Sequence, residues 1–229
     1  MENDRILEEF IELTGISSPS LGERQMADIL KCRLAELGFT VYEDKAGEVL
    51  GGSAGNVIGR LKGNKGTPVM LCAHMDRVAN GDGIKHVIED GKIMSDGTTI
   101  LAADDVSGIV AILGGLRLLN ESKLEHCDIE VVFTVSEEKL LQGSKKLDYG
   151  LLNAKHSYCF DSSGRIGRII NAAPSQAQIH VDVYGKSAHA GQAPEKGINA
   201  LKAAGKILAD VQDGRLDFET TANWGVIKA

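Results

Sequence analysis

The chain has 229 residues, 43% of them hydrophobic, which is enough for one large domain or one and a half ordinary ones around a buried core. Its net charge of −7 disfavours a nucleic-acid-binding surface, and no apolar run approaches the roughly 20 residues that cross a bilayer. The N-terminus does not resemble a signal peptide, and the four cysteines lack a CxxC spacing, so we expect a cytoplasmic protein with buried thiols (Cys32, Cys72, Cys127 and Cys159).

Two amphipathic helices are predicted near the N-terminus. The first covers Asn3–Thr14, where apolar residues follow helical spacing, and Gly15 ends it. Ser20–Glu23 has the capping-box pattern and predicts the start of a second helix that stops at Gly38. Short strands are expected at residues 39–42 and 56–61.

Three later apolar runs are predicted as strands of one sheet, at Val69–Ala73, Ile129–Val135 and Ser157–Phe160. The first run is expected to be buried on both faces. A hairpin with its tip at Asp90-Gly91 follows the first run, and a helix follows Asp104-Asp105. Because strands alternate with helices, we predict an α/β fold with a mostly parallel sheet and helices on both faces.

The sequence changes character close to Ala172-Ala-Pro174. Gln178–Tyr184 alternates apolar and polar residues, which predicts a half-exposed strand. A helix is expected at about residues 197–211 and a final strand near residues 221–227. We therefore expect a large α/β domain at residues 1–173 and part of a smaller α+β domain at residues 174–229.

Four segments carry acidic residues or a histidine, each just after the carboxyl end of a predicted strand or just before the helix that follows it. This is the edge at which α/β sheets bind ligands. Each group has an ordinary explanation when taken alone: a helix cap, a solvated turn or an Asx turn. Their occurrence at four separate positions favours one shared site. A histidine with several carboxylates suits two divalent ions that share a bridging carboxylate. The residues are His74 with Asp76, Asp105, Glu137 with Glu138, and Asp161.

Nucleotide and serine-hydrolase sites are disfavoured. Gly185-Lys-Ser187 has the end of a Walker A motif, but His180 stands where its first glycine is needed. The sequence contains neither a dinucleotide-binding G-x-G-x-x-G in the required context nor a G-x-S-x-G nucleophile elbow.

Six segments, in order along nearly the whole chain, resemble the co-catalytic zinc peptidases that include peptidase T, glutamate carboxypeptidase and succinyl-diaminopimelate desuccinylase. The peptidase T-like branch is the most similar. The segments are Ala73–Asp76, Ser95–Asp105, Ser136–Glu138, Asp161–Gly164, Ala172–Pro174 and Gly185–Gly191. The resemblance implies a zinc-exopeptidase-like catalytic domain, part of a lid domain, and hydrolysis of short peptides that releases an N-terminal residue.

The resemblance also implies a ligand set for two zinc ions. His74 and Asp161 would bind the first zinc, Glu138 the second, and Asp105 would bridge them. The last ligand of the second zinc in the family is a C-terminal histidine, which this chain does not contain. We therefore expect at most one tightly bound zinc and negligible peptidase activity for the chain as given.

Three further roles follow from the same resemblance. Asp76 would orient His74, Glu137 would be the general base, and His189 on the lid would help to hold the oxyanion. The chain departs from the family at Arg77 and at Val106-Ser107, which we expect to alter pocket charge more than metal binding.

The substrate and the activity leave alternatives open. A deacylase of N-acyl amino acids would use the same two-metal machinery. An inactive fragment or pseudoenzyme would act through association, because unpaired strand edges in a partial lid invite a homodimer. No nucleic-acid or membrane partner is expected.

Overall fold

The computed structural model describes residues 2–228, with side chains from Asp4 onward. These residues form two compact units, one up to Gly164 and one from Arg165 onward. The boundary after residue 173, placed on the change in sequence pattern, stays a prediction.

A five-stranded sheet forms the centre of the N-terminal unit. Its strands, in spatial order, are β1 (Thr40–Glu43), β2 (Val57–Leu61), β6 (Ile129–Thr134), β3 (Val69–His74) and β7 (His156–Cys159). Strand β2 is antiparallel to both neighbours, whereas β3 is parallel to β6 and to β7. Four of the five strands therefore run in the same direction, and the predicted α/β fold with a mainly parallel sheet is confirmed.

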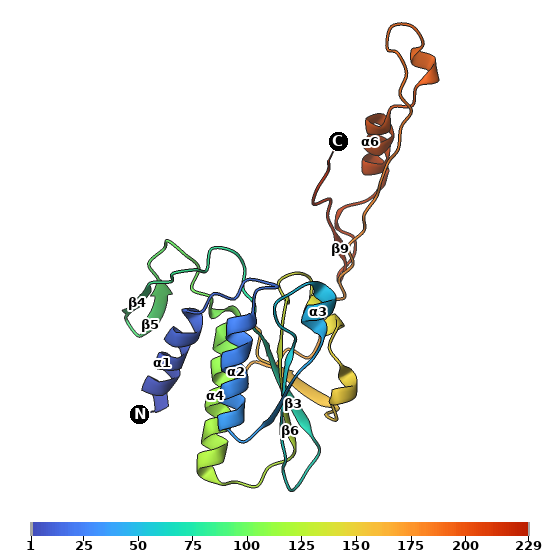
Figure 1. The fold of residues 1–229 in the computed structure, drawn as a ribbon. Helices are drawn as coiled ribbons and strands as arrows, with labels where there is room; N and C mark the ends of the chain where they lie inside the picture. The colour runs from blue at the N-terminus through green and yellow to red at the C-terminus, as the bar shows by residue number, and fades with distance from the viewer. Residues whose placement is uncertain (1, 229) are drawn as a thin grey trace. The chain divides into compact units, whose positions relative to one another are not determined.

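Three helices cover one face of this sheet: α1 (Glu2–Thr14), α2 (Arg24–Glu36) and α4 (Ala103–Ser122). Helix α2 packs on β1 and β2, α4 packs on β3, and α1 lies against α4 (Figure 1). Leu34, Ile109 and Phe133 in this layer are fully buried. The main hydrophobic core therefore lies between the helices and the sheet.

The opposite face has a thinner cover of short elements, α5 (Gln142–Lys145) and the 3-10 turn η1 (Tyr149–Leu151), whereas the short helix α3 (Ala46–Leu50) packs against the main core through Ala46 and Leu50. A small apolar cluster around Ile58, Val132 and Leu147 lies on this side. Because the cover is thin, Met70 and Cys72 on this side are half-buried, so β3 is not buried on both faces as predicted, and β7 is exposed.

The predicted hairpin is confirmed. Strands β4 (His86–Glu89) and β5 (Lys92–Ser95) pair antiparallel, with Glu89 opposite Lys92. Asp90 and Gly91 between them have φ angles of +50° and +71°, the left-handed pair that a two-residue type I′ turn requires.

The capping box predicted at Ser20–Glu23 is wrong. Helix α2 begins at Arg24 with Glu23 as its N-cap residue, and no side-chain cap bond is found there among the described residues. The Ser20 hydroxyl and the Glu23 carboxylate instead hydrogen-bond to the segments that follow β3 and β6. The pattern was correctly placed before a helix, but its polar groups serve tertiary contacts.

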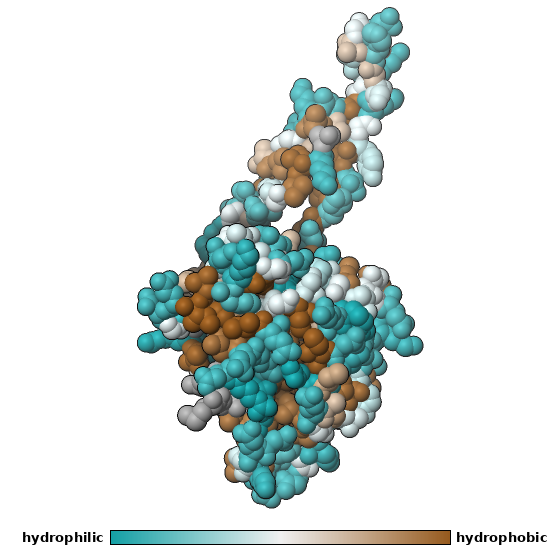
Figure 2. Space-filling view, turned by 60° about the vertical axis from the view of Figure 1, so that its left-hand side comes forward, coloured by the Kyte–Doolittle hydropathy of each residue, from teal (hydrophilic) through white to brown (hydrophobic). Residues whose placement is uncertain are grey.

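The C-terminal unit contains η2 (Pro194–Lys196), α6 (Ala200–Asp210) and the two-residue strands β8 (Gly214–Arg215) and β9 (Thr221–Ala222). The predicted helix is confirmed, whereas residues 178–184 form no strand, and the last predicted strand shortens to β9. A strand needs a partner for its backbone groups, and within residues 2–228 no segment pairs with residues 178–184. Apolar side chains of this unit are exposed, including Ile179, Tyr184 and Phe218, and Figure 2 shows brown side chains on its surface.

The cysteines differ from the expected buried thiols. Cys32 and Cys159 are exposed, and Cys72 and Cys127 are half-buried; all four are free thiols. Within the described part of the chain, no helix combines the length and the apolar character needed to span a membrane.

Candidate metal site

The imidazole of His74 lies at the carboxyl end of β3 and is 3% exposed as a residue. Its Nδ1 lies 2.8 Å from the backbone carbonyl oxygen of Asp76, which accepts a hydrogen bond when Nδ1 carries the proton. Its Nε2 lies 3.0 Å from Oδ1 of Asp104. This arrangement leaves Nε2 directed at the carboxylates, as a metal-binding imidazole requires.

The carboxylate of Asp76 is buried and fully engaged. Oδ2 accepts a hydrogen bond from the Ser20 hydroxyl at 2.6 Å, and Oδ1 accepts one from the Glu137 N–H at 2.8 Å. The Glu138 N–H donates to Oδ2 at 3.2 Å. Burial alone would raise the pKa of Asp76, but the hydrogen bonds from His74, Ser20 and Glu137 outweigh burial and lower the pKa. Asp76 therefore stays charged and joins the end of β3 to the turn after β6.

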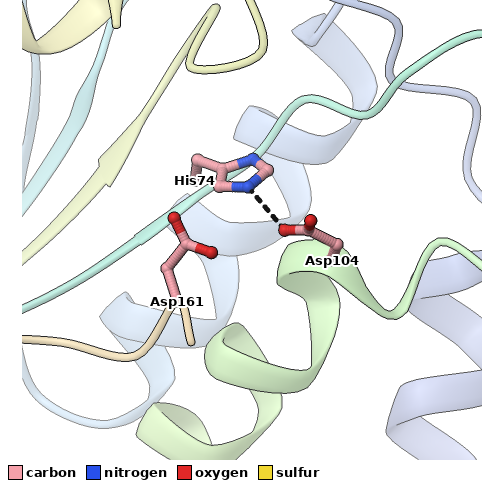
Figure 3. A group of neighbouring side chains, drawn as sticks. All are labelled: His74, Asp104 and Asp161. Carbon is pink, nitrogen blue, oxygen red and sulfur yellow. Dashed lines mark hydrogen bonds and ion pairs between the residues drawn. The ribbon is translucent and has the colours of Figure 1, made fainter. Parts of the chain in front are cut away.

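Two groups of side chains come close enough to hold a metal ion. His74, Asp104 and Asp161 form the first group, and their ligand atoms lie within 4.8 Å of one another. Figure 3 shows these three side chains converging from the end of β3, the start of α4 and the segment after β7. His74, Glu137 and Glu138 form the second group. The two groups share the imidazole.

Among the described residues, neither group contains Asp105, and Asp104 occupies the position expected for it. Oδ2 of Asp105 accepts a hydrogen bond from the His74 N–H at 3.1 Å, and Oδ1 accepts one from Gly108 N–H at 3.2 Å. Asp105 is 2% exposed, and burial together with the charge of Asp161 raises its pKa to about 8, although the charge of His74 opposes this shift. The backbone at Asp104 (φ −85°, ψ 106°) is not helical, and the two neighbouring carboxylates serve different partners.

The electrostatics of the cluster favour a cation. Burial raises the pKa of Asp161 and of Glu138, and the charge of Asp104 raises both further. Burial likewise raises the pKa of Glu137, with added repulsion from Asp161 and Glu138. These carboxyl groups repel one another, and a divalent ion among them would offset that repulsion. One imidazole with several carboxylates is a donor set that zinc and related divalent ions accept.

His74 itself has a raised pKa. Burial lowers the pKa, but the hydrogen bond to Asp76, the charge of Asp105 and the hydrogen bond to Asp104 outweigh burial and raise the pKa to about 10. A bound ion would replace the proton on Nε2, so protons and metal compete for the same atom.

Glu23 and Ser20 support the site from the loop before α2, a role that sequence reasoning missed. Glu23 is fully buried, and its Oε1 accepts hydrogen bonds from Leu21 N–H at 2.8 Å and from Ser136 N–H at 3.0 Å. Ser136 directly precedes Glu137, so Glu23 fixes the turn that carries both glutamates. The S-x-x-E pattern is the sequence signal for these two residues, but the same pattern predicts a helix cap.

The remaining predicted residues lie away from these groups or in the other unit. His189 belongs to the C-terminal unit, where its Nδ1 accepts a hydrogen bond from Gly191 N–H at 3.2 Å. Arg77, expected to alter pocket charge, is buried and donates from Nη1 to the carbonyl oxygens of Thr14 and Gly81. The Arg77 guanidinium therefore stabilises the C-terminal end of α1.

Residues 56–199, more than half of the chain, match peptidase family M28. The chain belongs to this family. Residues 171–229 also match a peptidase dimerisation domain. The resemblance to peptidase T-like metallopeptidases is confirmed by the solved structures that are similar to the chain.

Two of these are peptidase structures. The aminopeptidase PepT from Bacillus cereus ATCC 10987 is 40% identical with a TM-score of 0.84, and the similarity covers 96% of this chain and 60% of that one. A tripeptidase from Staphylococcus aureus subsp. aureus Mu50 is 33% identical with a TM-score of 0.81, covering 97% of this chain and 60% of that one.

A curated relative, the uncharacterized protein YqjE of Bacillus subtilis (strain 168), is 45% identical over 222 residues, which are 96% of this chain and 60% of YqjE. The chain therefore spans about 60% of the length of this relative and of both peptidase structures.

Proposed function

We propose that the protein is a metal-dependent aminopeptidase that releases the N-terminal residue of short peptides, with tripeptides as its preferred class. The observation that carries the proposal is the convergence of His74, Asp104 and Asp161 at one end of the sheet, beside Glu137 and Glu138. The similarity to the aminopeptidase PepT and to the tripeptidase supports the substrate class. We place the start of the lid at residue 174 and the protein in the cytoplasm.

We propose zinc as the metal, with two ions in a complete site. His74 and Asp161 would hold the first ion and Glu138 the second. Asp104, rather than Asp105, would be the carboxylate that the two ions share. Two observations support this exchange: Asp104 Oδ1 lies 3.0 Å from His74 Nε2, and the charge of Asp104 acts on both Asp161 and Glu138. Asp105 would instead position His74 through its backbone N–H.

Divalent ions held there would supply the acidification of water and the polarisation of the scissile carbonyl. Glu137 would be the general base, which takes a proton from the attacking water and delivers it to the leaving amine. Two features suit Glu137 to this role: its pKa is raised, chiefly by burial, and its backbone N–H is fixed by Asp76. Asp76 keeps His74 in the tautomer with an unprotonated Nε2. It also holds the turn that carries Glu137 and Glu138 against the end of β3.

The C-terminal unit would supply the lid and the contact between subunits. We propose that His189 stabilises the oxyanion and that residues 174–229 contribute to a homodimer. The match of residues 171–229 to a peptidase dimerisation domain supports the dimer. The exposed apolar side chains of this unit, among them Ile179 and Phe218, are consistent with a surface that pairs with another chain.

The direct test is an assay of protein purified from its source, with its intact mass recorded. A tripeptide with a free N-terminus and an N-acetyl amino acid are incubated side by side, each with zinc and with a chelator. We expect metal-dependent release of the N-terminal residue from the tripeptide. Preferential cleavage of the N-acetyl compound would make the protein a deacylase. Zinc binding without turnover of either compound would make it a pseudoenzyme.

A further inference from the structure

Two of the four cysteines are direct neighbours on adjacent strands of the sheet. Cys72 in β3 and Cys159 in β7 are direct partners in the register of these parallel strands. Side chains of paired residues lie on the same face of a sheet, and the two thiols are hydrogen-bond partners. The pairing was not visible in the sequence, where 86 residues lie between the two cysteines (positions 73–158).

The spacing of the strands suits a disulfide. Neighbouring strands lie about 4.7–4.9 Å apart, and disulfides join residues whose Cα atoms are about 4.4–6.8 Å apart. A bond between the two sulfur atoms therefore requires no large movement of either strand.

The pair lies immediately next to the metal ligands. Cys72 precedes His74 by two residues, and Cys159 precedes Asp161 by two residues. Phe160 N–H donates to the Cys72 carbonyl oxygen at 2.9 Å, so the pairing of the two segments continues toward the site. Residues two apart in extended chain project to one side, which places the thiols on the same side of β3 as the His74 imidazole.

We propose that Cys72 and Cys159 form a reversible disulfide that regulates the metal site. The oxidant class is a low-molecular-weight disulfide. One thiol of the pair attacks it first, forming a mixed disulfide and releasing one small thiol. The other thiol then attacks the mixed disulfide at the protein sulfur and releases the second small thiol. One S–S bond forms in the protein and one breaks in the oxidant, and the two protons and two electrons of the protein thiols pass to the two small thiols.

The disulfide would disturb metal binding because it draws the two Cβ atoms to about 3.8 Å, closer than the spacing of about 4.7–4.9 Å between neighbouring strands. That contraction acts on β3 and β7 directly beside His74 and Asp161. We expect the oxidised chain to bind zinc about 10-fold or more weakly, the size of effect that altered support of a metal ligand produces.

The experiment uses the metal-free 229-residue chain, oxidised with oxidised glutathione and then alkylated. We expect the intact mass to show the loss of two hydrogen atoms, peptide mapping to show Cys72 joined to Cys159, and dithiothreitol to reverse both changes. Cys72→Ser and Cys159→Ser should each abolish the bond. The double variant Cys32→Ser/Cys127→Ser is the matched control and should retain it.

Zinc affinity is then measured by calorimetric titration of the Cys32→Ser/Cys127→Ser variant in both redox states. A stable glutathione adduct on Cys159, a bond to another cysteine, or no loss of hydrogen would overturn the assignment of the pair. Equal zinc affinity in the two states would overturn the proposed regulation. The mass and mapping results do not depend on the proposed function, whereas the effect on zinc affinity rests on the proposed metal site: a reduced chain that binds no zinc would overturn that site and leave the assignment of the disulfide standing.

Discussion

The Oδ1 atom of Asp76 accepts a hydrogen bond from the backbone N–H of Glu137 at 2.8 Å, and this contact joins two segments that are 61 residues apart in sequence. The same carboxylate lies 3.6 Å from Nδ1 of His74. One buried group therefore fixes the imidazole and the turn that carries both glutamates. The geometry of the site depends on Asp76 although Asp76 is not in either metal-binding group.

Asp76→Asn should weaken zinc binding by roughly 10–100-fold, as changes to groups that support a metal ligand typically do. The amide cannot accept hydrogen bonds at both of its ends, so the contact to Ser20 or to Glu137 is lost. Calorimetric titration of the metal-free protein measures the effect. Asp82→Asn, in the exposed loop after β3, is the control for the loss of one negative charge. Unchanged zinc affinity in Asp76→Asn would show that Asp76 does not support the metal site.

Glu137→Gln should reduce peptide turnover by about 10²–10⁴-fold in the active protein while zinc content stays nearly unchanged. The amide cannot take a proton from water, whereas the backbone N–H that anchors residue 137 to Asp76 remains. Steady-state kinetics and elemental analysis of the same sample check both parts. Loss of zinc from this variant would exchange the proposed roles of Glu137 and Glu138.

Two glycines of α4 provide a matched pair for testing how the helix supports the site. A Cβ at Gly108 would lie 2.3 Å from Asp105 Oδ1 and 2.3 Å from the Phe160 carbonyl oxygen, whereas no described atom lies within 4 Å of a Cβ at Gly115. We expect Gly108→Ala to destabilise the protein by about 1–3 kcal/mol through overpacking. Gly115→Ala should stabilise it by about 0.5–1 kcal/mol through helix propensity. Urea unfolding compares the two, and equal effects would contradict the close contact.

Much of the fold was predictable from periodicity, and the exceptions have physical causes. Helix α1, the parallel strands and the Asp90-Gly91 turn depend on local patterns and were predicted correctly. Residues 178–184 have a strand pattern, but backbone pairing needs a partner, which periodicity cannot supply.

The residues of the candidate metal site divide in the same way, into those that sequence patterns identify and those whose roles depend on tertiary structure. The strand ends identified His74, Asp76 and Asp161 as residues of one region, because the carboxyl ends of parallel strands share an edge. The choice between Asp104 and Asp105 depends on two dihedral angles at the start of α4, which residue types do not determine. Ser20 and Glu23 matched a helix-cap pattern, and their contacts to Asp76 and to Ser136 are tertiary.

The ion pair of Glu43 should make stability depend on pH. Arg24 donates to both Glu43 oxygens at 2.8 Å, and this hydrogen bonding lowers the pKa of Glu43 to about 2 although burial opposes the shift. Because the folded-state pKa lies below the ordinary value of 4.5, the stabilisation is present above about pH 4.5 and is lost as the pH falls toward 2.

The corresponding measurement is the difference in free energy of unfolding between the wild type and Glu43→Gln across this range. We expect the difference to be largest near neutral pH and to shrink as the pH falls from 4.5 to 2. Glu48→Gln, on the short helix α3, is the control for removal of one carboxylate. A Glu43→Gln difference that does not change with pH would contradict the ion pair.

The central claim is that His74, Asp104 and Asp161 hold a divalent ion at the carboxyl edge of the sheet, and zinc content after dialysis tests it most directly. Elemental analysis should compare the wild-type 229-residue chain with Asp104→Asn and with Asp105→Asn. We predict that the wild type and Asp105→Asn retain zinc, since Asp105 hydrogen-bonds to backbone N–H groups, and that Asp104→Asn loses it. Retention by Asp104→Asn together with loss from Asp105→Asn would contradict the account.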